Sequence, residues 1–198
     1  MTAVNPEDVI AAWDQPGATA SIHPTRGISE GAYWASGEAQ AELLARDILA
    51  GSRVMDFGCG DGRVAVPLRA LGYDVTGVDA APRMLAALKK HAPDLPTFQS
   101  DGSDFGKHVG RRKFDAVYCL AVLIHHSHAT GEQLVERLRA VVRKGGLLVL
   151  DWPVADEPAE TDAWIGVTTW SREQQDNITT RLGLERLDVD RPWAVYQA

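Results

Sequence analysis

Residues 54–63 read VMDFGCGDGR, and this stretch decides how the chain folds. A short apolar run, typical of a buried strand, breaks into Gly58, Gly60 and Gly62, and a helical pattern of apolar residues resumes after them. Glycine suits such a turn because the backbone can bend sharply and approach a ligand with no Cβ in between. A helix that starts after the turn points free N–H groups toward a bound molecule. We therefore predict a strand, a tight turn and a helix start that together bind a ligand.

Length and composition indicate one soluble domain over residues 1–198, large enough to bury a core of its own. Hydrophobic residues make up 45% of the chain and charged residues 24%, which is ordinary for a globular protein. No apolar run approaches the roughly 20 residues that cross a bilayer, and residues 1–12 lack the pattern of a signal peptide. We therefore expect a cytoplasmic protein without a membrane partner.

The formal net charge of -7 argues against nucleic acid as a partner, because an acidic surface repels phosphate groups. The sequence contains no stripe of Lys and Arg with interleaved aromatic residues. The two cysteines, Cys59 and Cys119, are too few for a disulfide framework, and we expect reduced, buried thiols. The oligomeric state stays open at this point.

Strand-like and helix-like patterns alternate along the chain, which is typical of an α/β fold. The order predicts a doubly wound, mostly parallel seven-stranded sheet with helices on both faces and an antiparallel C-terminal hairpin. The strands are expected at 53–57, 73–79, 97–100, 114–120, 147–152, 184–190 and 193–197.

Helix starts are predicted from capping residues. Ser36 is expected to cap a helix that runs to about Ala50. Thr130 and Ser171 each begin a capping box, and the helix after Thr130 is expected to end at Lys144.

Three kinds of nucleotide ligand compete for the glycine turn. A dinucleotide site of the Gly-x-Gly-x-x-Gly kind needs a third glycine where this chain has Arg63, which weakens that reading. A phosphate loop ends in Gly-Lys-Ser or Gly-Lys-Thr, and neither tripeptide occurs in the sequence.

The third kind rests on four elements that recur in order. The motif Asp56-x-Gly58-x-Gly60-x-Gly62, the acid Asp79, the pair Asp101-Gly102 and the run FDAVYC at 114–119 resemble the class I S-adenosylmethionine-dependent methyltransferases. The resemblance runs from about residue 36 to 152. It implies a Rossmann-like methyltransferase fold, with S-adenosyl-L-methionine as the cofactor.

The resemblance also implies roles for individual residues. The glycines would let the methionine half of the cofactor lie on the backbone, and Asp56 would help hold its ammonium end. Asp79 would accept hydrogen bonds from both ribose hydroxyls, a pairing that suits a carboxylate. Met84 would contact the adenine, although a methionine there is also a common core filler. The implied cofactor-binding set is Asp56, Gly58, Cys59, Gly60, Gly62, Asp79, Ala80, Met84, Asp101, Gly102, Cys119 and Leu120.

We expect three segments within the single domain. Residues 1–35 would be an N-terminal lid or surface segment, and 36–152 the cofactor-binding core. Residues 153–198 would hold an acceptor-side loop, the last helix and the C-terminal hairpin. The loop, 153–170, is too long for a simple connection, and tryptophans at 152, 164 and 170 suggest an apolar floor.

Methyl transfer mainly needs alignment of the reactants, and a base is required only when the acceptor must lose a proton. His125 follows the fourth strand and is the candidate base, with a packing role as the alternative. No metal site is expected, since the cluster of His125, His126 and His128 lacks a clear carboxylate at ligand spacing. The short chain favours a small organic acceptor, methylated on oxygen or nitrogen. A non-catalytic S-adenosylmethionine-binding module or partner subunit and an NAD(P)-dependent oxidoreductase stay open as alternatives.

Overall fold

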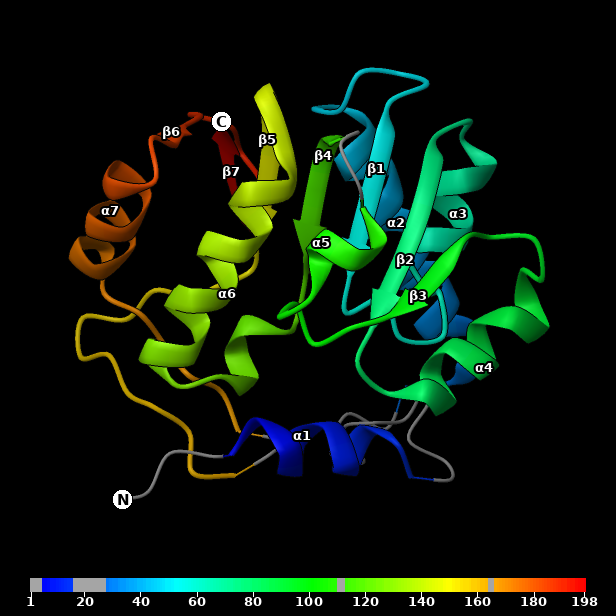
Figure 1. Ribbon diagram of the computed structural model, residues 1–198, viewed down its shortest axis with the longest axis horizontal. Helices are drawn as coiled ribbons and strands as arrows, with labels where there is room; N and C mark the ends of the chain where they lie inside the picture. Colours follow the sequence, from blue (N-terminus) through cyan, green and yellow to red (C-terminus); the bar gives the residue numbers. More distant parts are fainter. Residues whose placement is uncertain (1–4, 16–27, 110–112, 164–165) are drawn as a thin grey trace. The chain divides into compact units, whose positions relative to one another are not determined.

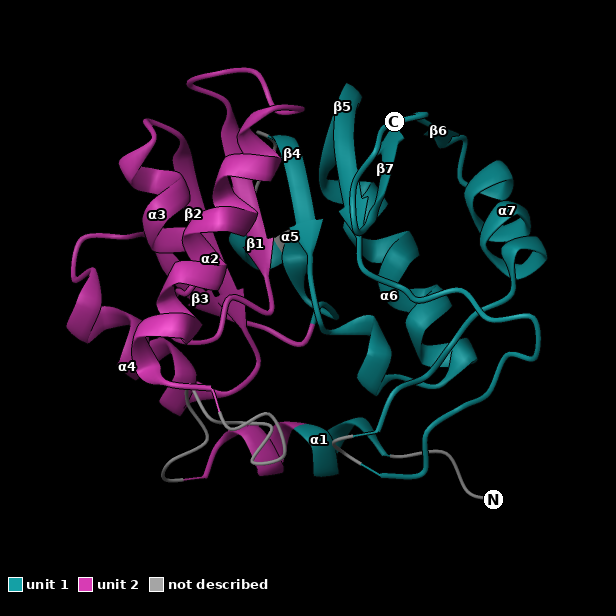
Figure 2. Cartoon of the chain, turned by 180° about the vertical axis from the view of Figure 1, so that it is seen from behind, with its two compact units in different colours: residues 1–9, 102–198 teal, residues 10–101 magenta. Residues whose placement is uncertain are grey.

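The computed structural model describes residues 5–15, 28–109, 113–163 and 166–198 (Figure 1). The chain forms two compact units, residues 10–101 and residues 1–9 with 102–198 (Figure 2). The strands in the described residues belong to a seven-stranded sheet in the order β3-β2-β1-β4-β5-β7-β6, which confirms the predicted fold class. The strand bounds are β1 Arg53–Phe57, β2 Asp74–Asp79, β3 Thr97–Gln99, β4 Phe114–Cys119, β5 Val142–Leu150, β6 Glu185–Arg186 and β7 Ala194–Gln197.

Unit 10–101 is built on three parallel strands. β1 pairs with β2, so that Val54 lies opposite Val75, and β2 pairs with β3. The helices are α2 Glu30–Ala45, α3 Ala65–Ala70 and α4 Pro82–His91. Figure 2 shows α2 and α3 on the near side of β1 and β2, where α3 packs on β2 and on α2. Val54, Leu68 and Leu88 are fully buried in the resulting core.

Unit 1–9 with 102–198 is built on β4, β5, β7 and β6. β4 and β5 are parallel, with an irregular register between Phe114 and Ala116, whereas β7 is antiparallel to both β5 and β6. Figure 1 shows α6 in front of β4 and β5, and α7 beside β6. The helices are α5 Phe105–His108, η1 Leu123–His125, α6 His128–Val141 and α7 Arg172–Arg181, and α1 Pro6–Trp13 begins in this unit. Tyr118 and Tyr196 are among its fully buried side chains.

The predicted start of the first long helix is wrong. α2 begins at Glu30 and not after Ser36, and the Ser29 hydroxyl caps it by accepting a hydrogen bond from the Ala32 N–H at 3.2 Å. Ser36 lies within the helix and donates to the Tyr33 carbonyl at 2.7 Å. Gly31 and Gly37 lower the helix propensity of this segment, so sequence patterns hide its first two turns.

One of the two predicted capping boxes is present. The Ser171 hydroxyl accepts from the Gln174 N–H at 3.0 Å, and the Gln174 side chain accepts from the Ser171 N–H at 2.8 Å. The helix predicted from Thr130 to Lys144 is displaced: Ser127 caps α6, which ends at Val141, and β5 begins at once at Val142. Ser127 and Thr130 are both of residue types that commonly cap helices, so the start of α6 is ambiguous from sequence alone.

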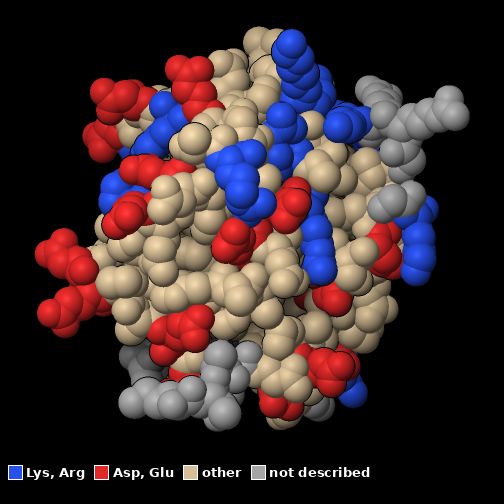
Figure 3. Space-filling model, turned by 60° about the vertical axis from the view of Figure 1, so that its left-hand side comes forward, with Lys and Arg blue, Asp and Glu red and all other residues tan. Residues whose placement is uncertain are grey.

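Charges of both signs are mixed on the face shown in Figure 3, where Lys and Arg lie among Asp and Glu. Arg181 illustrates the mixing, since its guanidinium lies 2.7 Å from the Glu132 carboxylate. Among the described helices, none is both long and apolar enough to cross a membrane.

Replacing two glycines of α2 with alanine should have opposite effects on stability. A Cβ at Gly37 would lie 2.0 Å from the Arg63 carbonyl oxygen, whereas a Cβ at Gly31 would meet nothing within 4 Å. We expect Gly37→Ala to lower the free energy of unfolding by about 2–3 kcal/mol, because backbone has to move to relieve the clash. Gly31→Ala is the matched control, and should raise it by about 0.5–1 kcal/mol through helix propensity. Urea titration of both variants measures the difference, and equal effects would contradict the close packing of α2 on residue 63.

Candidate functional site

The glycine turn after β1 adopts left-handed backbone conformations. The φ angles of Gly58, Gly60 and Gly62 are 77°, 54° and 92°, a region that side chains disfavour. A Cβ at Gly62 would lie 2.9 Å from Val66 and 3.0 Å from Leu88, so this glycine permits internal packing. A Cβ at Gly60 would meet nothing within 4 Å, so the turn presents open space at this position.

Backbone N–H groups fasten the turn to the end of β2. The Gly58 and Cys59 N–H groups both donate to the Val78 carbonyl, at 2.8 and 3.0 Å. The Gly60 N–H donates to Oδ2 of Asp79, and the Ala81 N–H donates to Oδ1, each at 2.8 Å. A carboxylate offers about four acceptor positions. These bonds hold Asp79 in one orientation.

Three carboxylates give the turn a concentrated negative charge. Asp56 and Asp61 are both 4% exposed, and Asp79 is partly buried. Burial raises the pKa of Asp79, and the Asp61 charge adds to the increase, against hydrogen bonds from backbone N–H groups that lower it. Burial and the Asp56 and Asp79 charges raise the pKa of the Cys59 thiol well above its usual value. Cys59 is therefore a neutral thiol, and the surroundings favour a cationic ligand group.

α2 supports the turn through contacts that the sequence prediction missed. The Tyr33 hydroxyl donates to Oδ1 of Asp61 at 2.8 Å. The Arg63 guanidinium lies 5.4 Å from the centre of the Tyr33 ring and donates to the Ser36 hydroxyl at 2.9 Å. Burial and the Asp61 charge raise the pKa of Tyr33, so its hydroxyl stays a donor. The available signal was Asp61 itself, an acid between two glycines of the motif.

The end of β3 lies beside the end of β2. The Ser100 N–H donates to the Asp79 carbonyl at 3.1 Å, and the Gln99 amide donates to the Ala80 carbonyl at 3.0 Å. Asp101 is exposed, whereas Met84, in the first turn of α4, is only 2% exposed. The structure thus brings Ala80 and the segment before Asp101 together, and buries Met84 as a core residue would be.

In the other unit, β4 ends in a strained turn. Cys119 is fully buried and its carbonyl accepts from the Asp151 N–H at 3.1 Å, while Leu120 is partly buried. Ala121 has a φ of 57°, the only non-glycine residue of the described chain with a positive φ, and its N–H donates to Oδ2 of Asp151 at 3.2 Å. Such strain persists only where neighbouring contacts maintain it. Gly102, which is also in this unit and in the predicted cofactor-binding set, has a positive φ of 91°.

The predicted histidines follow this turn. His125 ends η1, is 4% exposed, and its N–H donates to the Val122 carbonyl at 2.9 Å. The 153–170 loop lies beside it, since the Thr168 N–H donates to the Ile124 carbonyl at 2.8 Å. In the described residues, no group of three or more His, Cys, Asp or Glu could hold a metal ion.

The two described tryptophans at the ends of the 153–170 loop, Trp152 and Trp170, are buried and form no exposed floor. Trp152 is 3% exposed and Trp170 is 1% exposed, and their ring centres lie 5.4 Å apart. The two rings pack on each other in the core, because removing the apolar surface of an indole ring from water stabilises the fold. Trp164 lies outside the described residues.

The strained turn predicts a stabilising substitution. We expect Ala121→Gly to raise the free energy of unfolding by about 0.5–1 kcal/mol, because glycine removes the left-handed penalty at a smaller entropic cost. The same change at Ala86, an exposed position inside α4, should lower it by about 1 kcal/mol. Thermal and urea unfolding compare the two variants, and destabilisation at both positions would argue against strain at Ala121.

Comparison with known proteins places this geometry in a family. A family model described as a methyltransferase domain matches residues 54–146. A ubiquinone biosynthesis O-methyltransferase from Methylocella silvestris is 31% identical over 170 residues, which are 74% of this chain and 63% of that relative. A trans-aconitate 2-methyltransferase from Delftia acidovorans is 35% identical over 116 residues, 57% of this chain and 42% of that relative. The chain thus spans less than two thirds of the length of these relatives.

Solved structures share the fold. The magnesium protoporphyrin IX methyltransferase of Synechocystis, crystallised with bound S-adenosylmethionine, superposes with a TM-score of 0.72 at 17% identity, over 100% of this chain and 98% of that chain. The 1,6-didemethyltoxoflavin-N1-methyltransferase of Burkholderia thailandensis gives a TM-score of 0.70 at 16% identity, over 100% and 92%. These structures show the shared fold, and the methyltransferase-domain match over residues 54–146 together with the 31% identity to the ubiquinone relative places the chain in the class I S-adenosylmethionine-dependent methyltransferase family.

Proposed function

We propose that this protein transfers a methyl group from S-adenosylmethionine to an oxygen or nitrogen of a small organic acceptor. S-adenosylmethionine is the cofactor of the family, in agreement with the sequence prediction. The observation that carries the proposal is the Asp79 carboxylate, which two backbone N–H groups orient beside the left-handed glycine turn.

Residues of unit 10–101 suit the methionine and ribose parts of this cofactor. When bound, S-adenosylmethionine supplies a methyl group on a positively charged sulfur. The remaining acceptor positions of Asp79 suit two ribose hydroxyls. The open space at Gly60 admits a close approach to the backbone, and the Asp56 and Asp61 charges favour the ammonium and sulfonium groups.

The remaining cofactor residues are proposed from the family resemblance. Ala80 and Met84 would flank the adenine, and Asp101 and Gly102 would meet its amino group. Backbone groups of Cys119 and Leu120, at the end of β4, would complete the set. The buried Met84 side chain makes it the least supported member.

The acceptor would lie near η1 and the 153–170 loop. Two observations support this: the loop is bonded to Ile124, next to His125, and it follows β5 directly. The ubiquinone relative is named as an O-methyltransferase and the toxoflavin neighbour as an N-methyltransferase, so both acceptor atoms stay in the proposal. The chain's task in this reaction is to orient the nucleophile and to exclude water. His125 would take the proton from a hydroxyl acceptor.

A labelled-methyl assay tests the proposal. The protein would be incubated with S-adenosylmethionine carrying a labelled methyl group and a panel of phenols, carboxylic acids and amines, and products would be identified by mass spectrometry. Labelled product from at least one small acceptor is expected. Tight S-adenosylhomocysteine binding with no product across the panel would favour a non-catalytic binding module. Binding of NAD(P) without S-adenosylhomocysteine would favour an oxidoreductase.

Asp79 gives the sharpest test of the cofactor assignment. We expect Asp79→Asn to weaken S-adenosylhomocysteine binding about 30- to 100-fold, as measured by calorimetry, because hydrogen bonds to a charged acceptor are worth about 2–3 kcal/mol. Asp74→Asn is the matched control, since Asp74 is exposed at the opposite end of β2. Affinity unchanged in the Asp79 variant would disprove the ribose assignment.

The raised pKa of Asp79 adds a pH dependence to this binding. The ionised carboxylate is the form that accepts two hydroxyl hydrogen bonds, so affinity should fall as the pH decreases through the raised pKa. The fall should begin at a higher pH than an ordinary aspartate would give, and should be absent in Asp79→Asn. Parallel curves for both proteins would assign the pH effect to other groups.

His125 is tested by its effect on turnover of a hydroxyl acceptor. We expect His125→Gln to lower kcat about 100-fold and to leave S-adenosylhomocysteine affinity unchanged, because general-base catalysis typically contributes this much. His108→Gln, a histidine of the short helix α5, is the control. A kcat within twofold of the wild-type value would leave His125 with a packing role.

A further inference from the structure

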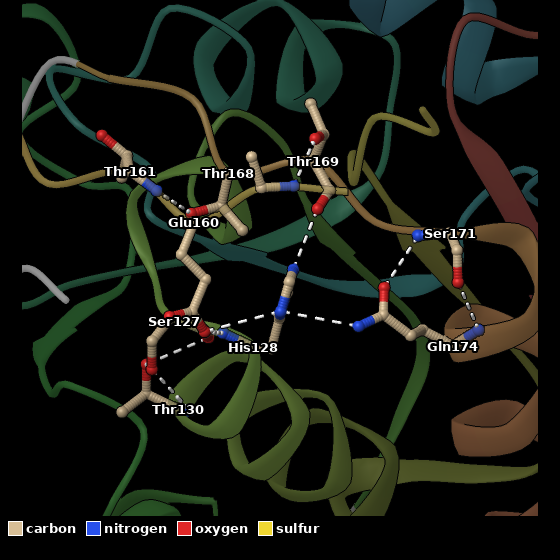
Figure 4. A network of polar contacts seen from close by, with 10 residues as sticks. Ser127, His128, Thr130, Glu160, Thr161, Thr168, Thr169, Ser171 and Gln174 are labelled. Carbon is tan, nitrogen blue, oxygen red and sulfur yellow. Dashed lines mark hydrogen bonds and ion pairs between the residues drawn. The ribbon is translucent and has the colours of Figure 1, made fainter. Parts of the chain in front are cut away.

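His128 joins three separate segments of unit 1–9 with 102–198 (Figure 4). It is the first residue of α6, and its backbone N–H donates to Oε1 of Glu160 at 2.6 Å. Its ring Nε2 lies 2.9 Å from the Thr169 carbonyl oxygen. One residue therefore contacts both arms of the 153–170 loop, 32 and 41 residues further along the chain.

The neighbours of the ring determine how His128 bonds. A carbonyl oxygen only accepts, so Nε2 carries the hydrogen and donates to Thr169. Nδ1 lies 3.5 Å from the Gln174 amide nitrogen and 3.5 Å from Oε1 of Glu160. The Gln174 orientation is itself determined, because its Oε1 accepts from the Ser171 N–H in the capping box. Nδ1 thus has the Gln174 amide donor beside it, while Nε2 donates to the Thr169 carbonyl.

The two described arms of the loop, residues 153–163 and 166–170, are hydrogen-bonded to each other. The Trp170 N–H donates to the Pro153 carbonyl at 2.8 Å, and the Ala155 N–H donates to the Trp170 carbonyl at 2.9 Å. The Thr169 N–H donates to the Ala159 carbonyl at 2.9 Å. These bonds pair the two arms, so a contact to either arm also restrains the other.

Aromatic packing adds to the hydrogen bonds. The His128 ring lies 4.8 Å from the Trp170 ring, edge to face. Trp170 also packs against α6 at Gly131, where a Cβ would lie 2.8 Å from its ring. The loop is therefore seated on the first turn of α6 by polar contacts from His128 and by a buried indole.

We propose that His128 is a positioning residue that fixes the 153–170 loop against η1 and thereby determines which acceptors fit. The inference rests on the proposed function, because the loop is assigned there to the acceptor side. The cofactor-binding residues of unit 10–101 take no part in it. Loss of His128 should change the loop and the acceptor KM while the affinity for S-adenosylhomocysteine stays the same.

Hydrogen exchange measured by mass spectrometry tests the structural half without any acceptor. In His128→Ala, the peptide over residues 153–171 should exchange about tenfold faster, since a hydrogen bond of roughly 1–1.5 kcal/mol is lost. His128→Gln should restore protection, because the glutamine Nε2 is the same number of bonds from the backbone as the histidine Nε2. Glu157→Ala, an exposed carboxylate of the same loop, is the control and should exchange as the wild type does.

Kinetics with any acceptor that the labelled-methyl assay identifies test the functional half. His128→Ala should raise the acceptor KM at least fivefold, with the S-adenosylmethionine KM within twofold, and His128→Gln should return it toward the wild-type value. Unchanged exchange in His128→Ala, or an equal rise of KM in Glu157→Ala, would overturn the inference. If the wild type turns over no small acceptor, the proposed function fails, and the exchange result still decides whether His128 fixes the loop.

Discussion

Hydrogen bonds between the glycine turn and the end of β2 hold the site end of unit 10–101 in place. Two successive N–H groups, of Gly58 and Cys59, donate to one carbonyl, and the next, of Gly60, donates to Asp79. A chain can present N–H groups in this way only if it turns through left-handed conformations, which explains glycines at alternate positions. The same bonds orient the Asp79 carboxylate, so the shape of the turn and the chemistry of the proposed ribose contact have one cause.

A second support comes from α2, which lies before the motif in the chain. Two contacts of α2 support the turn: Gly37 lies close to the backbone of Arg63, and Tyr33 donates a hydrogen bond to Asp61. α2 precedes the turn in the sequence, whereas β2 follows it. Asp61 is almost fully buried, and a buried carboxylate without a donor would be costly. The Tyr33 hydroxyl supplies that donor and in return anchors the helix. The turn is thus held in place by contacts within its own unit, which would limit the ordering cost of binding the proposed cofactor.

In unit 1–9 with 102–198, a strained turn and a bonded loop lie on the proposed acceptor side. Strain at Ala121 is maintained by the Asp151 carboxylate, and the 153–170 loop is held by His128 and by buried tryptophans. The loop is therefore packed and bonded, unlike a loosely attached connection. One fold can carry many functions, and a loop whose position depends on a few side-chain contacts is a natural place for such differences.

Patterns in the sequence were sufficient to predict the strand-turn-helix motif, the mostly parallel α/β fold class, the Ser171 capping box and the family. The motif and the capping box depend on residues within a few positions of each other, whereas the fold class and the family depend on short local patterns that recur in order along the chain. The start of α2, the Tyr33–Asp61 bond across 28 residues, the strain at Ala121 and the burial of Trp152 and Trp170 were not predictable in this way. They arise when distant segments pack, because the conformation that a residue adopts then depends on neighbours that the local sequence does not specify. The sequence by itself determined the cofactor class, whereas the tertiary structure decided which side chains brace the glycine turn and hold the loop beside His125.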